Sequence, residues 1–263
     1  MPVSGRSFER YGGNTTCIEV VTEGFDILIL DAGTGIRELG NRLLHEKRTH
    51  IHLLLTHFHW DHIQGFPFFK PAYQKNVRID VYGTPCQGKD LRSCLEDVVA
   101  PPHFPIPPSA LKADIHYHPI PSKAFQIGEI AISTIPLNHP NSGIGYKIED
   151  AGKSFVFLTD NELKHDYPAG SAYPSYVDFT QNADLLIHDA EYMPDEYPKK
   201  KGWGHSTVED AVLLAQEASV RQLGLYHHNQ DRTDADVDAL VGYAQNLSAV
   251  PCFGVRQGME ISL

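Results

Sequence analysis

Three histidines and one aspartate of this chain fall within six residues, in the segment His57-Phe58-His59-Trp60-Asp61-His62. Neutral imidazole and carboxylate groups are the ligands that zinc prefers, and they also bind manganese and iron. In a loop that leaves a strand, His57 and His59 would point to one side, whereas Asp61 and His62 would come from the turn beyond. A run of surface or core histidines without metal is the simpler alternative. Because one tetrahedral site can hardly use four ligands from so short a segment, the spacing favours two adjacent metal sites.

A short apolar strand, predicted at 51–55, leads directly into this segment and would position it. A Glu23-Gly24 turn between two strand-like runs suggests a hairpin ahead of it. Further strands are predicted at 15–21, 25–30, 77–81, 114–118, 130–135, 145–148, 154–158, 185–187, 222–225, 252–255 and 259–263. Helices are predicted at 36–47, at 87–98, from 206 or 207 to 218, and at 233–246.

The order of these elements is strands first and helices then interleaved, twice over. Two half-domains that pack sheet on sheet, with helices outside, would bury every element. Five prolines between Ala100 and Ser109 predict an irregular surface excursion around 100–110. We therefore expect an α/β fold in a single domain that spans residues 1–263.

The composition is that of an ordinary globular protein, with 41% hydrophobic and 21% charged residues. The formal net charge of −11 disfavours a broad nucleic-acid footprint, because a phosphate backbone demands basic surface. We find no signal peptide and no membrane anchor, and the four scattered cysteines form no CxxC pair. Reduced thiols in a cytoplasmic protein are the expectation.

The His57–His62 segment resembles the signature of the metallo-β-lactamase superfamily, and later segments match that family in order: Leu137-Asn-His139-Pro, Phe157-Leu-Thr-Asp160 and Leu225-Tyr-His227-His228. The resemblance implies a four-layer αββα sandwich. It also implies that His57, His59 and His139 hold a first metal, that Asp61, His62 and His227 hold a second, and that Asp160 bridges the two. His228 competes with His227 for the last position.

Two further segments resemble ribonuclease Z within this superfamily, namely Leu185-Leu-Ile-His188-Asp189-Ala190 and Gly204-His205-Ser206-Thr207. By that resemblance, His205 protonates the leaving oxygen and Asp189 orients the His205 ring. We also assign Asp61 a catalytic role. A positioned imidazolium suits phosphodiester cleavage, because the departing alkoxide is a poor leaving group. A histidine that simply starts a helix is the alternative for His205. His188 is expected to be packed behind the site, and Asp31 to hydrogen-bond a ligand histidine.

The sequence departs from ribonuclease Z in having no long basic, glycine-rich arm and in reading Asn229-Gln-Asp-Arg232-Thr after the last ligand. These departures make it look more like the hydrolases of cyclic nucleotides and small phosphodiesters. We therefore predict hydrolysis of a small or cyclic nucleotide by a metal-bridging hydroxide, with His205 as general acid. His228 or Arg232 would hold the phosphate, and the segment ending at Asn14 would line the base or sugar pocket.

Several alternatives stay open at this point. The same di-metal site could cleave an ester, a thioester or a lactone, and tRNA 3′-processing or a non-catalytic metal-binding module is less favoured. The expected cofactors are two divalent ions, zinc first, with manganese or iron as alternatives. The expected partner is a small phosphodiester substrate, without a membrane or an extended nucleic acid, and a homodimer is possible by analogy.

Overall fold

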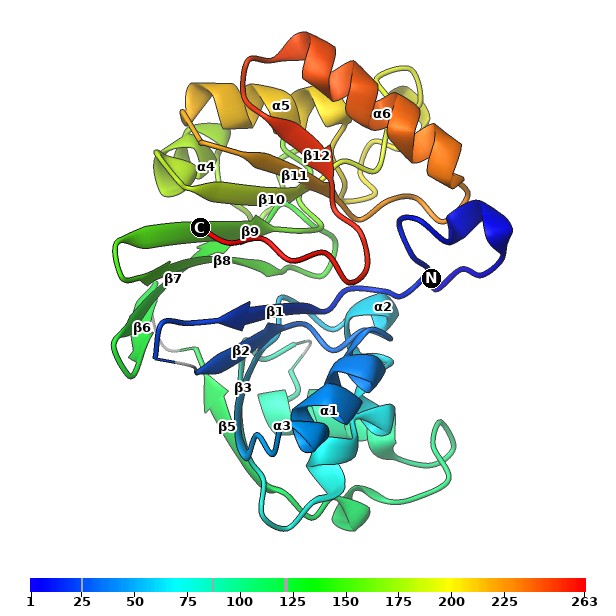
Figure 1. Ribbon diagram of the computed structural model, residues 1–263, viewed down its shortest axis with the longest axis vertical. Coiled ribbons are helices and arrows are strands. Elements are labelled where there is room, and N and C mark those ends of the chain that lie inside the picture. Colours follow the sequence, from blue (N-terminus) through cyan, green and yellow to red (C-terminus); the bar gives the residue numbers. More distant parts are fainter. Residues whose placement is uncertain (25, 87, 121–122) are drawn as a thin grey trace. The chain divides into compact units, whose positions relative to one another are not determined.

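The structure, a computed structural model, describes residues 1–24, 26–86, 88–120 and 123–263 (Figure 1). The chain divides into two compact units, each with its own sheet and core. Unit 1 consists of Met1–Pro2 and Asn14–Pro121, and unit 2 consists of Val3–Gly13 and Ser122–Leu263. The predicted mixed α/β class is confirmed, whereas the single domain stays a prediction.

Unit 1 is built on a five-stranded sheet with the order β1-β2-β3-β4-β5. Strand β1 is antiparallel to β2, and the remaining neighbours are parallel. The strands are β1 (Ile18–Val21), β2 (Ile27–Leu30), β3 (His50–Leu54), β4 (Arg78–Gly83) and β5 (Asp114–Pro119). The α-helices are α1 (Ile36–His45), α2 (Trp60–Ile63) and α3 (Leu91–Glu96), and the 3₁₀ turns are η2 (Phe66–Phe68), η3 (Lys70–Tyr73), η4 (Asp97–Val99) and η5 (Pro108–Ala110).

Alternate residues of the unit 1 strands form an apolar core with the helices. Ile29 of β2 and Leu53 of β3 pack in one cluster with Leu43 of α1 and Leu95 of α3, and all four side chains are fully buried. Because side chains alternate across a strand, the residues between them lie on the opposite face of the sheet. That opposite face carries His52 and Asp80 among its buried residues.

Unit 2 is built on a seven-stranded sheet with the order β12-β11-β10-β9-β8-β7-β6. Strands β9 to β12 are parallel, and β6 to β9 are antiparallel. The strands are β6 (Ala124–Ile127), β7 (Ile130–Pro136), β8 (Ile144–Asp150), β9 (Lys153–Leu158), β10 (Leu185–Asp189), β11 (Leu223–Tyr226) and β12 (Cys252–Gly254).

The helices of unit 2 are α4 (Tyr173–Thr180), α5 (Val208–Glu217) and α6 (Asp234–Leu247), and they lie along one face of its sheet (Figure 1). The 3₁₀ turns of the unit are η1 (Arg6–Phe8) and η6 (Tyr197–Lys199). Capping boxes fix the starts of α5 and α6, where the side chains of Thr207 and Thr233 each accept a bond from the third residue of their helix. The predicted starts of both helices are confirmed to within two residues.

Several predicted elements need correction. The helix expected from residue 87 begins only at Leu91, because the Asp90 carboxylate accepts a bond from Ser93 N and caps it there. Residues 259–263 are not a strand, since they have no ladder partner among the described residues. The expected starts at residues 25 and 87 lie outside the described residues. Helix α4 and strand β6 were not predicted. No helix among the described residues could span a membrane.

Candidate functional site

The histidine-rich segment lies at the carboxyl end of β3 in unit 1. Thr56 and His57 follow the strand, and the chain then enters the single-turn helix α2 at Trp60. The ring centroid of His57 lies 4.5 Å from that of His59 and 4.1 Å from that of His62. His62 Nε2 is 3.7 Å from Asp61 Oδ2. Unit 1 therefore brings all four predicted ligands of this segment together, and His57 and His62 are buried.

Asp31, at the end of β2, orients these imidazoles as the sequence predicted. Its Oδ2 lies 2.8 Å from His62 Nδ1, and its Oδ1 accepts a 2.8 Å bond from Thr56 N. Thr56 Oγ1 in turn lies 3.0 Å from His57 Nδ1. With Nδ1 engaged, each ring would bind a metal through Nε2, and such outer contacts are characteristic of metal-binding histidines. Asp31 has a left-handed φ of 64°, a strained conformation typical of functional sites.

Gly33 allows the ligand segment to approach the end of β2. A Cβ atom at this position would lie 2.3 Å from the carbonyl oxygen of Asp61 and 2.5 Å from Thr15 Oγ1. The residue after Asp31-Ala32 must therefore lack a side chain for the α2 turn to pack here.

Unit 2 presents a second group of predicted site residues at one edge of its sheet. Asp160 follows β9, Asp189 ends β10, and His227 follows β11. Since these strands are parallel and adjacent, their carboxyl ends meet at the same edge, where ligands of α/β sheets commonly bind. His139, in the turn after β7, reaches the same group.

The two carboxylate oxygens of Asp160 each face a different imidazole. Oδ2 lies 3.6 Å from His139 Nε2, and Oδ1 lies 3.4 Å from His227 Nε2. Two ligand atoms around one tetrahedral zinc ion lie roughly 3.3 Å apart, as follows from bonds of about 2.0–2.1 Å. Asp160 and His227 also have left-handed φ values of 57° and 52°. The spacing and the donor atoms fit a divalent ion, and they favour His227 over His228 as the ligand.

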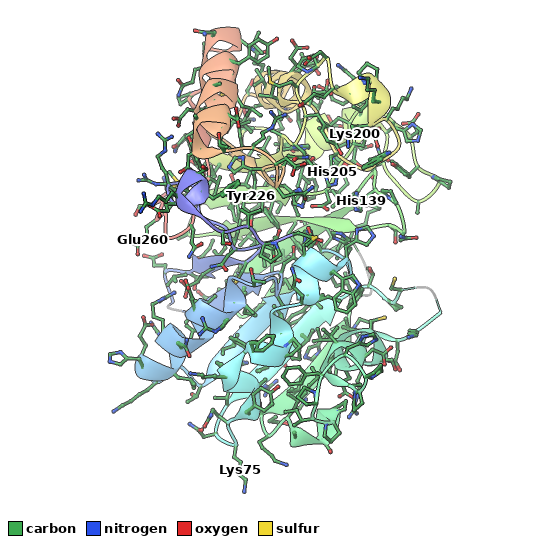
Figure 2. The ribbon with its side chains drawn as sticks, turned by 90° about the vertical axis from the view of Figure 1, so that its right-hand side faces the viewer. Lys75, His139, Lys200, His205, Tyr226 and Glu260 are labelled. Carbon is green, nitrogen blue, oxygen red and sulfur yellow. The ribbon has the colours of Figure 1, made fainter. Side chains whose placement is uncertain are left out.

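His139 is held by the backbone of the loop that carries His205. Its Nδ1 donates a 2.9 Å bond to the carbonyl oxygen of Gly204, which leaves Nε2 for the Asp160 side. A Cβ atom on Gly204 would lie 2.0 Å from that same Nδ1, and Gly204 has a φ of 91°. Both the conformation and the close approach therefore require glycine. Figure 2 shows the His139 and His205 side chains near one another, with ring centroids 5.3 Å apart.

The His205 ring lies between two carboxylates. Nδ1 is 3.4 Å from Asp189 Oδ2, and Nε2 is 3.3 Å from Glu191 Oε2. The ring also stacks on His227, with centroids 4.8 Å apart. Burial lowers the pKa of His205, but the carboxylates of Asp189, Asp160 and Glu191 outweigh it, so the pKa lies above its ordinary value. The geometry thus provides an imidazole whose protonated form is favoured by nearby carboxylates, beside the Asp160–His227 pair.

Asp189 is fixed by backbone donors and is completely buried. Its Oδ1 accepts a 3.0 Å bond from Asn161 N, and its Oδ2 accepts a 2.9 Å bond from Ser206 N. This carboxylate therefore ties the Asp160 turn to the start of the His205 segment. His188 is fully buried behind it and contacts Asn161 Nδ2 at 3.3 Å, as predicted.

A sequence-family model described as the beta-lactamase superfamily domain matches residues 27–228 of the chain. The chain belongs to this superfamily. Ribonuclease Z of Thermoplasma acidophilum is 26% identical over 250 residues, which cover 82% of this chain and 77% of that protein. The metallo-beta-lactamase fold protein YhfI from Bacillus subtilis superimposes with a TM-score of 0.71 at 19% identity, covering 94% and 90% of the two chains.

The short form of human tRNase Z gives a TM-score of 0.67 at 20% identity, with 99% of this chain and 96% of that chain covered. The predicted metallo-β-lactamase fold and the resemblance to ribonuclease Z are confirmed. This superfamily member is a metal-dependent hydrolase.

Two carboxylates beside the site were not predicted from the sequence. Glu191 contacts His205 and also lies 3.2 Å from His227 Nδ1 through Oε2. Burial raises the pKa of Glu191. Its bond with His227 and the charges of the two imidazoles outweigh burial, so the pKa lies below its ordinary value. Glu162 accepts three bonds from the loop that precedes His205 and a fourth from Tyr167 Oη. The sequence carried one signal for each of them. Glu191 comes two positions after Asp189, and Glu162 comes two positions after Asp160, both near strand ends.

The three residues predicted to contact the substrate, Asn14, His228 and Arg232, each have partners within the protein. Asn14 is exposed in unit 1, and its Oδ1 accepts a 3.1 Å bond from Thr34 Oγ1. In unit 2, His228 Nε2 donates a 2.9 Å bond to the carbonyl oxygen of Val255. Arg232 pairs with Glu196 and donates to the carbonyl oxygen of Glu191. His228 and Arg232 would therefore have to leave these partners to contact a substrate.

Proposed function

We propose that the protein hydrolyses phosphodiesters with two divalent ions, which are bound by the ligand set that the resemblance to the superfamily implies. The family match covers residues 27–228, a range that includes every proposed ligand. The observation that carries the phosphodiester assignment is His205, held between Asp189 and Glu191 and stacked on His227. A thioester hydrolase has less need for such a proton donor, because a thiolate is a better leaving group than an alkoxide. An alkyl ester or lactone hydrolase expels an alkoxide too, and against that candidate the similarity to relatives named Ribonuclease Z favours the phosphodiester.

The proposed ligands are His57, His59 and His139 for one ion and Asp61, His62 and His227 for the other, with Asp160 shared between them. Asp160 suits this role because its two oxygens face different imidazoles within unit 2. We favour zinc because imidazole and carboxylate are its common ligands, and manganese or iron would accept the same set. Two such ions, when bound, lower the pKa of water and neutralise charge on the phosphoryl group.

The protein's own residues supply the proton and its control. His205 Nε2 delivers a proton to the departing oxygen, and Asp189 holds the ring through Nδ1. Glu191 retains the proton on Nε2 until substrate displaces the carboxylate from its 3.3 Å contact. The carboxylate of Asp61, beside His62, has a second role as acceptor for the proton of the attacking water.

For the substrate, we propose a small or cyclic nucleotide, since the chain carries a net charge of −11. The second candidate is cleavage at the end of an RNA. It is favoured by the relatives named Ribonuclease Z and by the three consecutive lysines Lys199–Lys201 just before the His205 segment. A substrate panel of 2′,3′- and 3′,5′-cyclic nucleotides, an aryl phosphodiester, a precursor tRNA, a lactone and a thioester separates these candidates.

The His205→Ala variant tests the assigned chemistry. We expect it to keep its metal content but to lose 10²–10⁴-fold in kcat on a nucleotide with an alkoxide leaving group, in the range typical of general acid catalysis. Loss on an aryl phosphodiester should be at least tenfold smaller, because that leaving group needs little protonation. His45→Ala, an exposed histidine at the end of α1, is the matched control. Equal losses on the two substrates would contradict the proton-donor role.

A further inference from the structure

The sheet of unit 1 carries a cluster of histidines around one aspartate, away from the His57–His62 segment. The register of β3, β4 and β5 places His52 opposite Asp80 and Tyr82 opposite His118, with His50 one position along the same face of β3. Strands β3 and β5 are labelled in Figure 1, and β4 pairs with both. Residues of one parity on neighbouring strands share one face of the sheet. These side chains therefore point to the same side.

Asp80 is the centre of this cluster. Its Oδ2 lies 2.7 Å from His50 Nε2, and its Oδ1 lies 2.7 Å from His118 Nε2. The His52 ring centroid is 4.4 Å from that of His50. One potential ligand atom from each of His50, His52 and Asp80 lies within 4.8 Å of the others. Three imidazoles thus converge on one carboxylate.

The cluster is open to solvent on one side and buried on the other. The Asp80 side chain is only 2% exposed, whereas those of His50 and His118 are 48% and 42% exposed. Burial raises the pKa of Asp80, but bonds from Arg78, His50 and His118 outweigh it and hold the pKa well below its usual range. Burial also lowers the pKa of His52 to about 4, which leaves this ring neutral at neutral pH. A buried carboxylate with partly exposed imidazoles bonded to it is a suitable arrangement for cation binding.

We propose that His50, His52, Asp80 and His118 form an additional site for one divalent transition-metal ion, separate from the proposed catalytic ions. Three imidazoles and one carboxylate suit zinc, nickel or copper, whereas magnesium and calcium prefer all-oxygen ligand sets. The site is independent of the proposed function. His52 and His57 are five residues apart, which is about 16 Å along an extended strand.

His50, His52 and Asp80 need only small side-chain movements to bind an ion, and His118 would turn towards it from its contact with Asp80. Ligand atoms around a tetrahedral zinc lie roughly 3.3 Å apart, so the 2.7 Å contacts to Asp80 must open by about 0.6 Å. The exposed rings of His50 and His118 can rotate by this amount. Arg78 donates to both oxygens of Asp80, at 2.8 and 3.0 Å. A carboxylate has about four lone-pair positions, so it can keep this guanidinium and bind an ion as well.

Binding would tie three strands together, because the ligands come from β3, β4 and the edge strand β5. An ion that binds only the folded state raises the melting temperature of the protein. The site would therefore stabilise the open edge of this sheet, where β5 has one strand neighbour among the described residues.

Zinc titration of the full-length protein, stripped with a chelator and followed by metal analysis and calorimetry, tests the proposal. The double variant His50→Gln/His118→Gln removes two exposed ligands. The control is His116→Gln, a histidine on the same face of β5 that pairs with Asp114 instead. We expect the wild type and the control to bind one zinc equivalent more than the double variant, which keeps its hydrolytic activity. Asp80→Asn should lose the same equivalent.

Equal zinc stoichiometry in the wild type and the double variant would overturn the proposal. Loss of the extra zinc equivalent in His116→Gln, together with zinc-dependent dimers on gel filtration, would also overturn the proposal. The ion would then bridge two copies of the protein through surface histidines. Because the hydrolytic activity and the extra equivalent are measured separately, failure of this site is distinguishable from failure of the proposed catalytic ions.

Discussion

Glu162 offers a stringent test of how the His205 loop is held. The side chain is fully buried. Oε1 accepts bonds of 2.8 Å from Gly202 N and 2.8 Å from Tyr197 Oη, and Oε2 accepts bonds of 2.8 Å from Gly204 N and 2.9 Å from Tyr167 Oη. These bonds outweigh burial and lower the pKa of Glu162, so that it is ionised at neutral pH. The perturbation is Glu162→Gln, which keeps the shape and removes the charge.

The magnitude follows from the four bonds. An amide nitrogen in place of one oxygen cannot accept, so one backbone N–H of Gly202 or Gly204 is left unsatisfied at a cost of about 1–3 kcal/mol. The tyrosine hydroxyl on that side can rotate and accept instead. The two bonds to the remaining oxygen lose their charge assistance, at roughly 0.5–1 kcal/mol each. We therefore expect a loss of about 2–5 kcal/mol in the free energy of unfolding.

The assay is thermal unfolding together with hydrolysis of the best substrate from the panel. At about 2–4 °C per kcal/mol for a chain of this size, the melting temperature should fall by roughly 4–20 °C. Hydrolysis should also fall at least tenfold, because the carbonyl oxygen of Gly204 orients His139. Glu129→Gln, an exposed glutamate in unit 2, should change neither. A melting temperature within 2 °C of wild type for Glu162→Gln would refute this reasoning.

Three further predictions concern the proposed metal ligands. Gly204→Ala should lower metal affinity and activity more than 100-fold, because a Cβ atom would lie 2.0 Å from His139 Nδ1; near-normal zinc binding by calorimetry would contradict this. Asp31→Asn should weaken zinc binding by roughly 10–100-fold while the fold is retained by circular dichroism, because His62 loses its carboxylate partner; unchanged affinity would show that the pair is not needed for binding. Chelation should abolish hydrolysis and zinc should restore it, and activity that persists in metal-free protein, verified by metal analysis, would exclude the metal-dependent route.

The sequence predicted the site best where its ligands are close together in the chain. The His57–His62 segment follows one strand, so strand and turn chemistry alone suffice to gather its side chains in unit 1. His139, Asp160 and His227 come from three strand ends, and the sequence could group them only through resemblance to a known family. Within unit 2 they do lie together.

The residues that were missed depend on tertiary folding of a loop. Glu162 gains three of its partners because the segment 197–204 returns to the sheet edge, and Glu191 gains His205 and His227 from later parts of the chain. No local pattern encodes these contacts. Helix α4 was missed because it begins with a Tyr173-Pro174 pair and buries only two residues, so its sequence has little helical pattern. The sequence also gave no sign that His118 would share Asp80 with His50, since this requires the register of three strands.

The central claim is that the proposed ligand set binds two neighbouring divalent ions. Anomalous diffraction at the zinc edge from crystals of the zinc-loaded protein tests it most directly. The account predicts two neighbouring peaks, one bound by His57, His59 and His139 and the other by Asp61, His62 and His227, with Asp160 bound to both. Peaks bound by residues of one unit only, or a peak pair without Asp160 between them, would contradict it.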